Sequence, residues 1–442
     1  MSKDYSLYPG RFFKKSERLR SHHQALSPLF AFYSEEPDFA GHLRHLSLDT
    51  SRRRTIYIHI PFCTRNCTFC NLNRIKKLPP EDYYKLIIRE IKTYASYQYV
   101  SEGVYNAIYF GGGTPTTLST LGLKKILRTL RSSLTLAPDA EITVETTVFD
   151  LTKEKISMFK EEGVNRLSIG VQTFSDKGRR LLGRKGTAQE VIDKITFIRE
   201  SGFQNVGIDL IYNYPGQSED ELNKDLSNIE SLDLAGLSFY SLILHPKSAL
   251  YRMVNTGKCA PLGDLKQEWN YFNLILDRLL KRGFSFLELT KLVQPNRDSY
   301  NYIRIRYENG DTLALGAGGG GRLGDVIYFN SPNLNIYRQQ VKSSVGLPKR
   351  GFSIDYRYDI AHRLIGKLQF GQLKQVDLDF FKEDSKYLQR LTKDLVIDGL
   401  LQTHSAHFSL TRKGIFWGNN IGQEFARVLV RLLAHKTKNK NK

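Results

Sequence analysis

Cysteine and long apolar runs are both scarce in this sequence. Its 442 residues include only four cysteines, and three clustered ones cannot all pair with one another, so disulfides do not explain them. There is no run of about eighteen apolar residues, which argues against a transmembrane helix. The polar, basic start MSKDYSLYPGRFFKKSERLR lacks the apolar segment of a secretory signal. We therefore expect a globular cytoplasmic protein without membrane insertion.

Acidic residues are also in short supply. The sequence has 45 Asp and Glu against 65 Lys and Arg, a formal net charge of +20. Such a surface can bind nucleic acid, anionic lipid, an acidic small molecule or an acidic redox protein. No nucleic-acid module is recognisable, so we expect no nucleic-acid partner. We interpret the lysine-rich end HKTKNKNK and the arm before residue 55 as solvated, flexible ends, and attribute the remaining excess to a negatively charged substrate and an acidic electron donor.

Short apolar runs alternate with longer stretches of helical period between residues 55 and 244. The helical stretches include 81–97 and 123–134. The apolar runs are rich in Ile, Val, Phe and Tyr, as in strands buried on both faces, and span residues 55–60, 106–113, 142–147, 166–172, 206–215 and 237–244. The alternation predicts an α/β fold with a parallel sheet and right-handed crossovers. We expect a partial (β/α)6 relative of the (β/α)8 barrel, with its chemistry at the carboxyl ends of the strands.

The rest of the chain predicts an extension and a second domain. A helix over 264–284 precedes an extended hairpin region over 311–330, and beyond residue 355 the pattern is helix, helix, two-stranded wing and helix. We therefore divide the chain into an N-terminal arm (1–50), a barrel with its extension (51–350), a small winged-helix-like C-terminal domain (351–435) and a basic tail (436–442).

Three of the four cysteines, Cys63, Cys67 and Cys70, form a C-x3-C-x2-C motif. Cysteine thiolates are the usual ligands of iron–sulfur clusters, and three ligands leave one iron of a cubane cluster with an open position. An open metal position is typical of a catalytic site. A structural zinc site normally has four ligands in separated pairs; here Cys259 stands alone far downstream, and only His59 is near enough in sequence to complete such a site. The cluster is the better interpretation.

Glycines and polar residues occur where the predicted strands end. Gly111, Gly112, Gly113 and Thr114 close the second strand, and glycines let backbone approach a ligand closely. Glu145, Gln172 and Asp209 lie at or near the ends of the third, fourth and fifth strands; each alone is equally consistent with a solvated loop residue. A second glycine run, 316–321, formally satisfies G-x-G-x-x-G, but a dinucleotide site needs a helix directly after it and an acidic residue farther on. We interpret that run as a glycine loop at the mouth of the site.

The segment YIHIPFC, its C-x3-C-x2-C spacing and the following FGGGTPT together resemble radical S-adenosylmethionine (SAM) enzymes, and specifically the branch of oxygen-independent coproporphyrinogen oxidase. The resemblance covers roughly residues 50 to 420 and implies a [4Fe–4S] cluster on the three cysteines with SAM on the open iron. It implies that Phe69 lies against the adenine and that Tyr57, at the end of the first strand, covers the cofactor, although both suit a core aromatic too.

The same resemblance implies roles for other residues. Glu145, Gln172 and Asp209 would bind the SAM ribose and amino-acid moieties, and Arg184 would pair with a SAM carboxylate. Coproporphyrinogen oxidase binds two SAM molecules, and the matching positions here are Gly113, Thr114, Gln172, Arg184, Asp209 and Ile243.

Two departures from the oxidase pattern narrow the prediction. The oxidase carries a further cysteine as C-x-C, where this chain has Asn71 and continues Leu72, Asn73; its glycine loop carries a histidine, which GAGGGGRLGD lacks. The loop and the long N-terminal arm resemble the anaerobic haem-degrading methyltransferases of the ChuW/HutW type, the anaerobilin synthases. These transfer a methyl group from SAM to haem, open the macrocycle and release iron. A dianionic haem and an acidic flavodoxin would suit the basic surface; a decarboxylating oxidase and a haem chaperone are the alternatives.

Haem-iron ligands are not fixed by the sequence. His59, His245, His404 and His407 are candidates, but a single histidine is more often structural than ligating. The sequence identifies no catalytic residue.

Overall fold

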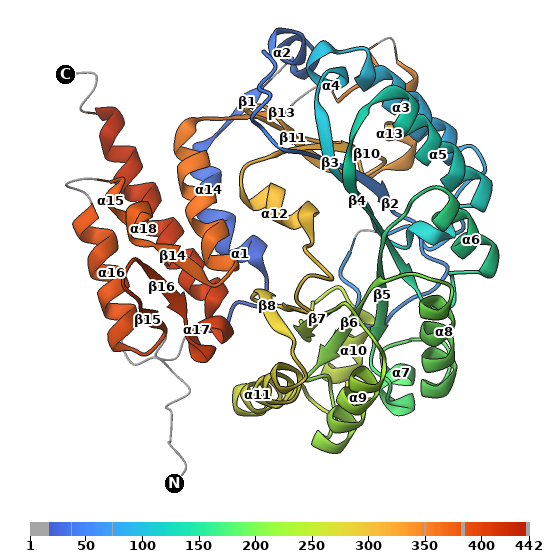
Figure 1. The fold of residues 1–442 in the computed structure, drawn as a ribbon, viewed down its shortest axis with the longest axis vertical. Coiled ribbons are helices and arrows are strands. Elements are labelled where there is room, and N and C mark those ends of the chain that lie inside the picture. Colours follow the sequence, from blue (N-terminus) through green and yellow to red (C-terminus); the bar gives the residue numbers. More distant parts are fainter. Residues whose placement is uncertain are drawn as a thin grey trace.

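The computed structural model describes residues 17–438, apart from 37, 73, 344, 349–350 and 382–384. Its centre is a thirteen-stranded sheet with the order β1-β13-β12-β11-β10-β2-β3-β4-β5-β6-β7-β9-β8. Figure 1 shows this sheet curving round the right of the view, with helices outside it and the C-terminal helices to the left. Residues 1–16 of the predicted arm and 439–442 of the predicted tail lie outside the described residues.

The six predicted strands form the parallel part of the sheet, and each pairs with the next in chain order. They are β2 (Arg54–Ile60), β3 (Val104–Gly112), β4 (Thr135–Thr147), β5 (Arg166–Gln172), β6 (Asn205–Tyr212) and β7 (Gly236–Ser241). The predicted α/β architecture with a parallel central sheet is confirmed. Along β2, Ile56, Ile58 and Ile60 are fully buried against the outer helices. Tyr57 and His59 therefore face the barrel interior, since successive side chains alternate between faces.

The helices of the crossovers cover the outside of the barrel (Figure 1). They are α3 (Tyr83–Ala95), α5 (Thr120–Ser133), α6 (Lys153–Glu161), α7 (Asp176–Leu181), α8 (Ala188–Glu200) and α9 (Glu219–Ser231). Their starts are encoded locally: α8 begins with a reciprocal capping box between Thr187 and Glu190, and α9 with one between Ser218 and Glu221.

The predicted hairpin region extends the sheet beyond β2. β10 (Asp311–Leu315) pairs parallel with β2 and adds a seventh parallel strand, which periodicity alone did not predict. β11 (Gly320–Leu323) and β12 (Val326–Phe329) form the antiparallel hairpin, followed by β13 (Gly351–Ile354) and β1 (Tyr33–Glu36). A strand, β11, thus begins within the second glycine run, and no helix follows the run directly. At the other edge lie β9 (Lys291–Val293) and β8 (Ser285–Glu288).

The barrel is open at one side, because β1 and β8 are the two ends of the sheet. Three helices occupy this side opening, between the strands and the C-terminal helices (Figure 1). They are α1 (His22–Leu26), α12 (Asn301–Tyr307) and α14 (Tyr356–Gln369), and α14 contacts both of the others.

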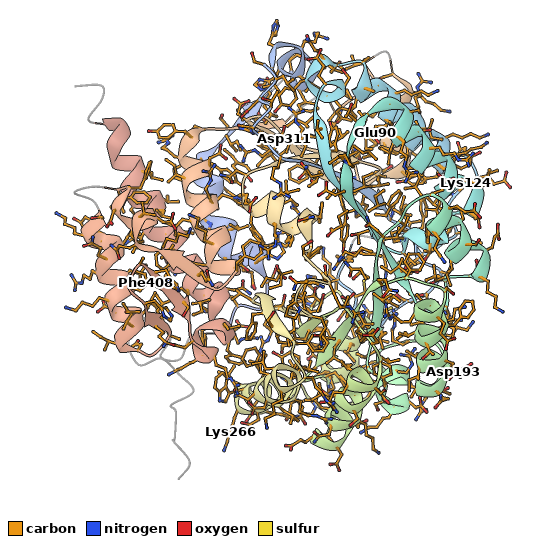
Figure 2. The ribbon with its side chains drawn as sticks, in the orientation of Figure 1. Glu90, Lys124, Asp193, Lys266, Asp311 and Phe408 are labelled. Atoms are coloured by element: carbon orange, nitrogen blue, oxygen red, sulfur yellow. The ribbon has the colours of Figure 1, made fainter. Side chains whose placement is uncertain are left out.

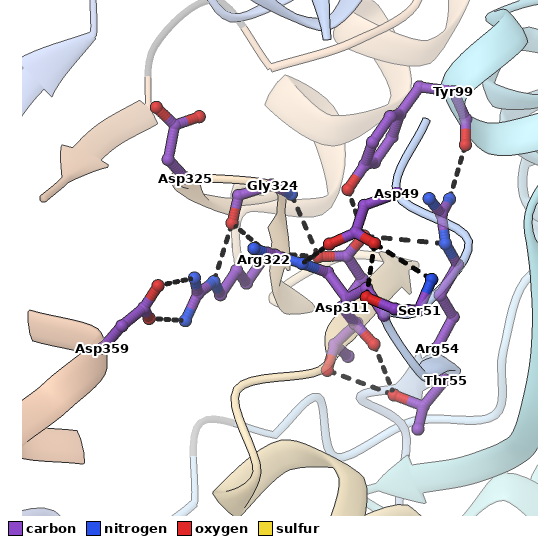
Figure 3. A network of polar contacts seen from close by, with 12 residues as sticks. Asp49, Ser51, Arg54, Thr55, Tyr99, Asp311, Arg322, Gly324, Asp325 and Asp359 are labelled. Atoms are coloured by element: carbon purple, nitrogen blue, oxygen red, sulfur yellow. Dashed lines mark hydrogen bonds and ion pairs between the residues drawn. The ribbon is translucent and has the colours of Figure 1, made fainter. Parts of the chain in front are cut away.

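A buried polar network around Asp311 fixes this side of the barrel (Figure 3). Tyr99 Oη donates to Asp311 at 2.6 Å, and the Gly324 amide donates to the same carboxylate at 3.0 Å. Arg322 pairs through both terminal nitrogens with Asp359 of α14. Bidentate guanidinium–carboxylate pairs are geometrically specific, so the network holds α14 at a defined position against the sheet.

The N-terminal arm is not a solvated, flexible end between residues 17 and 50, and that expectation is wrong for this stretch. Arg18 and Arg20 both pair with Glu268, which is fully buried on α11 (Leu265–Lys281). Farther along, β1 pairs with β13 through four register positions. This stretch is therefore held in place, because Arg18 and Arg20 meet a buried carboxylate and the backbone of β1 joins the sheet.

The C-terminal region contains the predicted helix, helix, wing and helix in that order, with one additional strand, β14, and two additional short helices, α15 and α17. Its helices are α14, α15 (Gln375–Asp379), α16 (Ser385–Ile397), α17 (Arg412–Phe416) and α18 (Gly418–Lys438). β14 (Gln372–Lys374), β16 (His407–Leu410) and β15 (Leu401–Thr403) form a separate sheet in that order. The boundaries that we predict for the domains stay a prediction.

The remaining elements of the described chain are short. They are η1 (Ser27–Phe32), α2 (Phe39–His45), α4 (Gln98–Ser101), η2 (Pro115–Thr117), α10 (Ala249–Asn255) and α13 (Leu334–Lys342). Figure 2 shows Lys124, Asp193 and Lys266 at the periphery, whereas Glu90 and Asp311 are fully buried. Over the described ranges, no helix combines the length and apolarity needed to cross a bilayer.

Candidate active site

The three cysteines lie on the loop that follows β2, and the end of β3 supports this loop. The Gly113 amide donates to the Ile60 carbonyl at 2.8 Å, and the Thr114 amide donates to the Phe62 carbonyl at 2.8 Å. A Cβ at Gly113 would lie 2.6 Å from the Phe62 oxygen and 3.0 Å from Cys63 Sγ. Only glycine allows this close approach. Thr114 Oγ1 is 3.5 Å from Cys63 Sγ, so the glycine motif and the first cysteine form one unit.

Arg184 closes the opposite side of the cysteine loop. Its Nη1 lies 3.2 Å from Cys67 Sγ, and its Nη2 donates to the Gly170 carbonyl. Gln172 is next to it: a Cβ at Gly170 would be 3.0 Å from Gln172 Nε2 and 3.5 Å from Arg184 Nη2. The backbone of Gln172 has φ 74°, in the left-handed region that non-glycine residues rarely adopt. The end of β5 thus turns sharply where Arg184 reaches the cysteines.

Glu145 of β4 lies inside the barrel beside the glycine strand end. Its Oε1 accepts from Tyr109 Oη at 2.5 Å, and its Oε2 accepts from the Gly112 amide at 3.3 Å. Enclosure in the barrel raises the pKa of Glu145 to about 7, against the lowering effect of the Tyr109 hydrogen bond. The carboxyl is poised to change protonation state near neutral pH.

Tyr57 is in the middle of β2, not at its end as predicted. Its ring stacks with Tyr302 of α12 at 6.0 Å, and its hydroxyl is 2.9 Å from His59 Nδ1. The His59 ring lies against the strand end, because a Cβ at Gly112 would be 2.7 Å from its Cε1. Burial lowers the pKa of His59 to about 4, so this imidazole is neutral at physiological pH.

Three other predicted residues occupy different surroundings. Asp209 lies inside the barrel on β6, where burial raises its pKa, while Lys291 opposes this effect. Phe69 packs against an apolar cluster that includes Leu182 and Leu242, which joins the cysteine loop to the barrel. Ile243 is 40% exposed in the segment after β7. Cysteines, glycines, Glu145, Gln172 and Arg184 are therefore brought together, whereas Ile243 is not tied to them by a described contact.

The residues present suit a cluster and a polar ligand. Cys63, Cys67, Thr114 and Arg184 line one cavity of about 160 Å³, and the buried Arg184 Nε has no hydrogen-bond partner among the described residues. A cationic nitrogen left unpaired beside two thiols is suited to an anionic ligand group. Within the described chain, no three His, Cys, Asp or Glu side chains converge to hold a single metal ion. In a cubane, by contrast, each cysteine binds a different iron, so its ligands need not converge on one point.

Several residues of the barrel interior were not predicted from the sequence. Tyr109, Tyr300 and Tyr302 form an aromatic cluster with Tyr57, and Arg306 of α12 lies 3.3 Å from the Tyr302 hydroxyl. The alternation of side chains along β2 and β3 would have placed Tyr57 and Tyr109 inside. The helix residues carried no such signal, because α12 comes from a distant segment.

The candidate histidines are dispersed. His59 faces the interior, whereas His404 and His407 stack on each other in the small C-terminal sheet at 4.4 Å. His245 lies in the segment after β7, where its Nδ1 accepts from the Lys247 amide at 3.2 Å.

Comparison with known proteins bears on the family. The model of the Radical SAM superfamily matches residues 57–229. The chain is 29% identical over 379 residues to the Heme chaperone HemW of Bacillus subtilis (strain 168), which covers 83% of this chain and 98% of that protein. It is also 29% identical over 383 residues to the Anaerobilin synthase of Escherichia coli O157:H7, covering 86% and 85%.

A solved structure shows the same fold. Coproporphyrinogen III oxidase (HemN) from Escherichia coli, described as a radical SAM enzyme, matches with a TM-score of 0.76 at 24% sequence identity, over 89% of this chain and 94% of that one. The predicted partial barrel with a C-terminal domain is therefore of the radical SAM type. Proteins of this superfamily use a [4Fe–4S] cluster and SAM. The chain therefore contains a radical SAM domain, and its relatives include a heme chaperone, an anaerobilin synthase and oxygen-independent coproporphyrinogen III oxidases.

Proposed function

We propose that this protein is a radical SAM C-methyltransferase that methylates haem, opens the porphyrin ring without oxygen and releases iron with a linear tetrapyrrole. In this proposal Cys63, Cys67 and Cys70 hold the [4Fe–4S] cluster. The SAM-binding residues are Tyr57, Phe69, Gly112, Gly113, Thr114, Glu145, Gln172, Arg184, Asp209 and Ile243, and two SAM molecules bind.

The observation that carries the proposal is a continuous series of contacts from the cysteines to an unpaired cation at the side opening. The series consists of Cys63, Gly113, Gly112, His59, Tyr57, Tyr302 and Arg306. Aromatic rings suit a flat macrocycle, and Arg306 has no carboxylate partner in the part of the chain that the structure describes. We infer that these residues contact a large, flat, anionic molecule whose one end lies near the SAM site.

The second glycine run also supports haem rather than coproporphyrinogen. A Cβ at Gly316 would be 2.2 Å from the His59 carbonyl oxygen, so this run packs directly on the end of β2. Glu90 holds it there, accepting from the Gly316 amide at 2.8 Å and from Asn330 Nδ2 at 2.7 Å. The run contains no histidine, and Asn71 follows Cys70, the last cysteine of the motif. Both positions depart from the oxidase pattern.

Each part of the site has a defined task. When bound, the cluster supplies the electron that cleaves the SAM sulfonium, and the protein positions the products of that cleavage. Arg184 offers an anion partner beside Cys67. Glu145 offers a carboxyl with its pKa raised to about 7, and the tyrosine rings exclude water from the interior.

The electron donor in this proposal is an acidic protein of the flavodoxin type, acting in the cytoplasm. The net charge of +20 supports an acidic partner, because complementary charge accelerates encounter. The proposal includes no nucleic-acid partner.

Anaerobic turnover tests the proposal. The reconstituted, reduced enzyme is incubated with SAM and haem, and the Soret band is followed together with mass spectrometry of the products. We expect loss of the Soret band and a methylated, iron-free linear tetrapyrrole. Intact haem after many rounds of SAM cleavage would refute the methyltransferase. A parallel incubation with coproporphyrinogen separates the alternatives, since decarboxylation there would establish the oxidase.

A further inference from the structure

Three imidazoles from two distant segments of the chain meet at the side opening of the barrel. His22 and His23 come from α1 and stack with ring centroids 4.0 Å apart, and His362 comes from α14. Tyr307 of α12 lies between them, 6.3 Å from the His22 ring and 6.2 Å from the His362 ring. Figure 1 shows the three helices side by side at this opening. The site is outside the cysteine region and has no role in the proposed SAM binding.

His362 is oriented as a ligating histidine would be. Its Nδ1 lies 2.7 Å from Asn309 Oδ1, and Asn309 Nδ2 donates to the Asp359 carbonyl at 2.7 Å. The second bond fixes the amide, so Oδ1 faces the ring and His362 Nδ1 is the donor. Nε2 then carries the lone pair, and it has no hydrogen-bond partner within the described ranges. A second-shell oxygen on one ring nitrogen and a free lone pair on the other is the arrangement of metal-binding histidines.

The neighbouring rings are also available as neutral donors. No ring nitrogen of His22 or His23 makes a hydrogen bond to another described residue. Burial lowers the pKa of His22 and of His362 to about 3 in each case, and the nearby Arg306 charge lowers both further. The imidazoles are therefore unprotonated at physiological pH.

Arg306 is the fixed positive charge of this cluster. Arg306 is an exposed residue of α12, and its described contacts are the Tyr302 hydroxyl at 3.3 Å and the Tyr302 ring at 5.4 Å. No ion pair to a described carboxylate satisfies it. A planar guanidinium suits a carboxylate through two parallel hydrogen bonds.

We propose that His362 Nε2 is an axial ligand of haem iron at the side opening. In this proposal His22 supplies a second imidazole ligand, and Arg306 binds a haem propionate. This inference rests on the proposed function in taking haem as the substrate. Haem as the ligand also explains why the histidines alone do not form a complete set of ligands for a metal ion. No three His, Cys, Asp or Glu side chains of the described residues could hold a free ion, whereas a metalloporphyrin brings its own nitrogens and needs only axial ligands.

The arrangement gives the N-terminal arm a function. The Arg18 and Arg20 pairs with Glu268 fix the chain directly before α1, and thereby place His22 opposite α14. The series of contacts through Tyr302 and Tyr57 then leads from this site to the cysteines. A haem bound by His362 would therefore be held with its macrocycle toward the SAM site.

Binding of ferric haem to the oxidised, full-length protein without SAM tests this site separately from turnover. We expect His362→Ala to weaken haem binding at least about tenfold and to shift the Soret band, and added free imidazole to restore the spectrum. Metal-free protoporphyrin should bind His362→Ala and the wild type equally, because it offers no iron. Arg306→Ala should weaken both ligands by about tenfold, since a charged hydrogen bond is lost.

His45→Ala, on the exposed end of α2, is the matched control and should bind haem as the wild type does. Thermal unfolding confirms that each variant is folded, and His22→Ala serves as a second ligand variant, with a smaller spectral change expected. Wild-type haem affinity and spectrum in both His362→Ala and Arg306→Ala would overturn the inference, as would equal weakening of haem and metal-free porphyrin by His362→Ala. If binding depends on these residues but haem is returned intact in the anaerobic assay, the site stands and the methyltransferase fails.

Discussion

The cysteine region and the side opening are built in opposite ways. At the cysteine region, Cys63, Thr114 and the glycines between them lie at the ends of adjacent strands, and each is part of a short motif. At the side opening, the histidines and Arg306 come from three helices, of which α1 lies hundreds of residues before α12 and α14 in the chain. The chemistry of the first can be recognised in sequence, whereas the second exists only after folding. This contrast explains why the superfamily is clear while the substrate has to be argued from geometry.

The largest effect should come from removing a cluster ligand. Cys67→Ala should abolish iron–sulfur content and SAM cleavage, because an incomplete ligand set does not retain the cluster, while haem binding at the side opening persists. Iron and sulfide analysis together with SAM-cleavage assays check this. Cys259→Ala, which changes the cysteine outside the motif, is the control and should retain both. Loss of haem binding in Cys67→Ala would show that the two regions are not separate.

The anchor of the N-terminal arm should matter next. Glu268→Ala leaves Arg18 and Arg20 without their buried carboxylate and should lower the free energy of unfolding by about 3 kcal/mol or more. Urea denaturation measures this. Haem binding should weaken with it, since α1 is released, but cluster content should not change.

The control for that variant is Glu424→Ala, which removes a surface pair with Arg427 and should cost less than about 1 kcal/mol. Equal losses in the two variants would contradict the anchoring role of Glu268.

Arg184→Gln should act on the cysteine region alone. Loss of one charge-assisted contact is worth about 1.5–3 kcal/mol, so the KM for SAM should rise about 10- to 100-fold at unchanged iron content and haem affinity. SAM titrations of initial rate give this value. Arg180→Gln, an exposed neighbour on α7, should leave the KM unchanged. If Arg184→Gln lost haem affinity but kept its KM for SAM, the assignment of Arg184 to the SAM site would be contradicted.

The smallest effect is a pH dependence at Glu145. Its pKa is raised to about 7 in the folded protein, so the folded state binds more protons than the unfolded state between about pH 4.5 and 7. Stability should therefore fall as the pH rises through this range, and Glu145→Gln should reduce that slope. Denaturation midpoints at several pH values measure it, with the exposed Glu102→Gln as control. An unchanged slope in Glu145→Gln would contradict the raised pKa.

Local patterns predicted the barrel well and the opening poorly. The six parallel strands, the cysteine loop and the strand-end glycines all follow from short motifs and periodicity. Tyr57 was placed at a strand end although the predicted run 55–60 matches β2, and the structure has this residue in the middle of that strand. The arm was expected to be flexible because of its charge, yet its Arg18 and Arg20 pair with Glu268, some 250 positions later in the chain. His22 and His362 could not be associated before α1 and α14 were seen together.

The fate of the SAM methyl group tests the proposed haem methyltransferase activity most directly. Reduced enzyme is supplied anaerobically with haem and with SAM that carries an isotopically labelled methyl group, and the tetrapyrrole is analysed by mass spectrometry. We expect the label on a linear, iron-free tetrapyrrole, formed by the wild type and not by Cys67→Ala. Unlabelled, intact haem recovered after SAM has been consumed would contradict it.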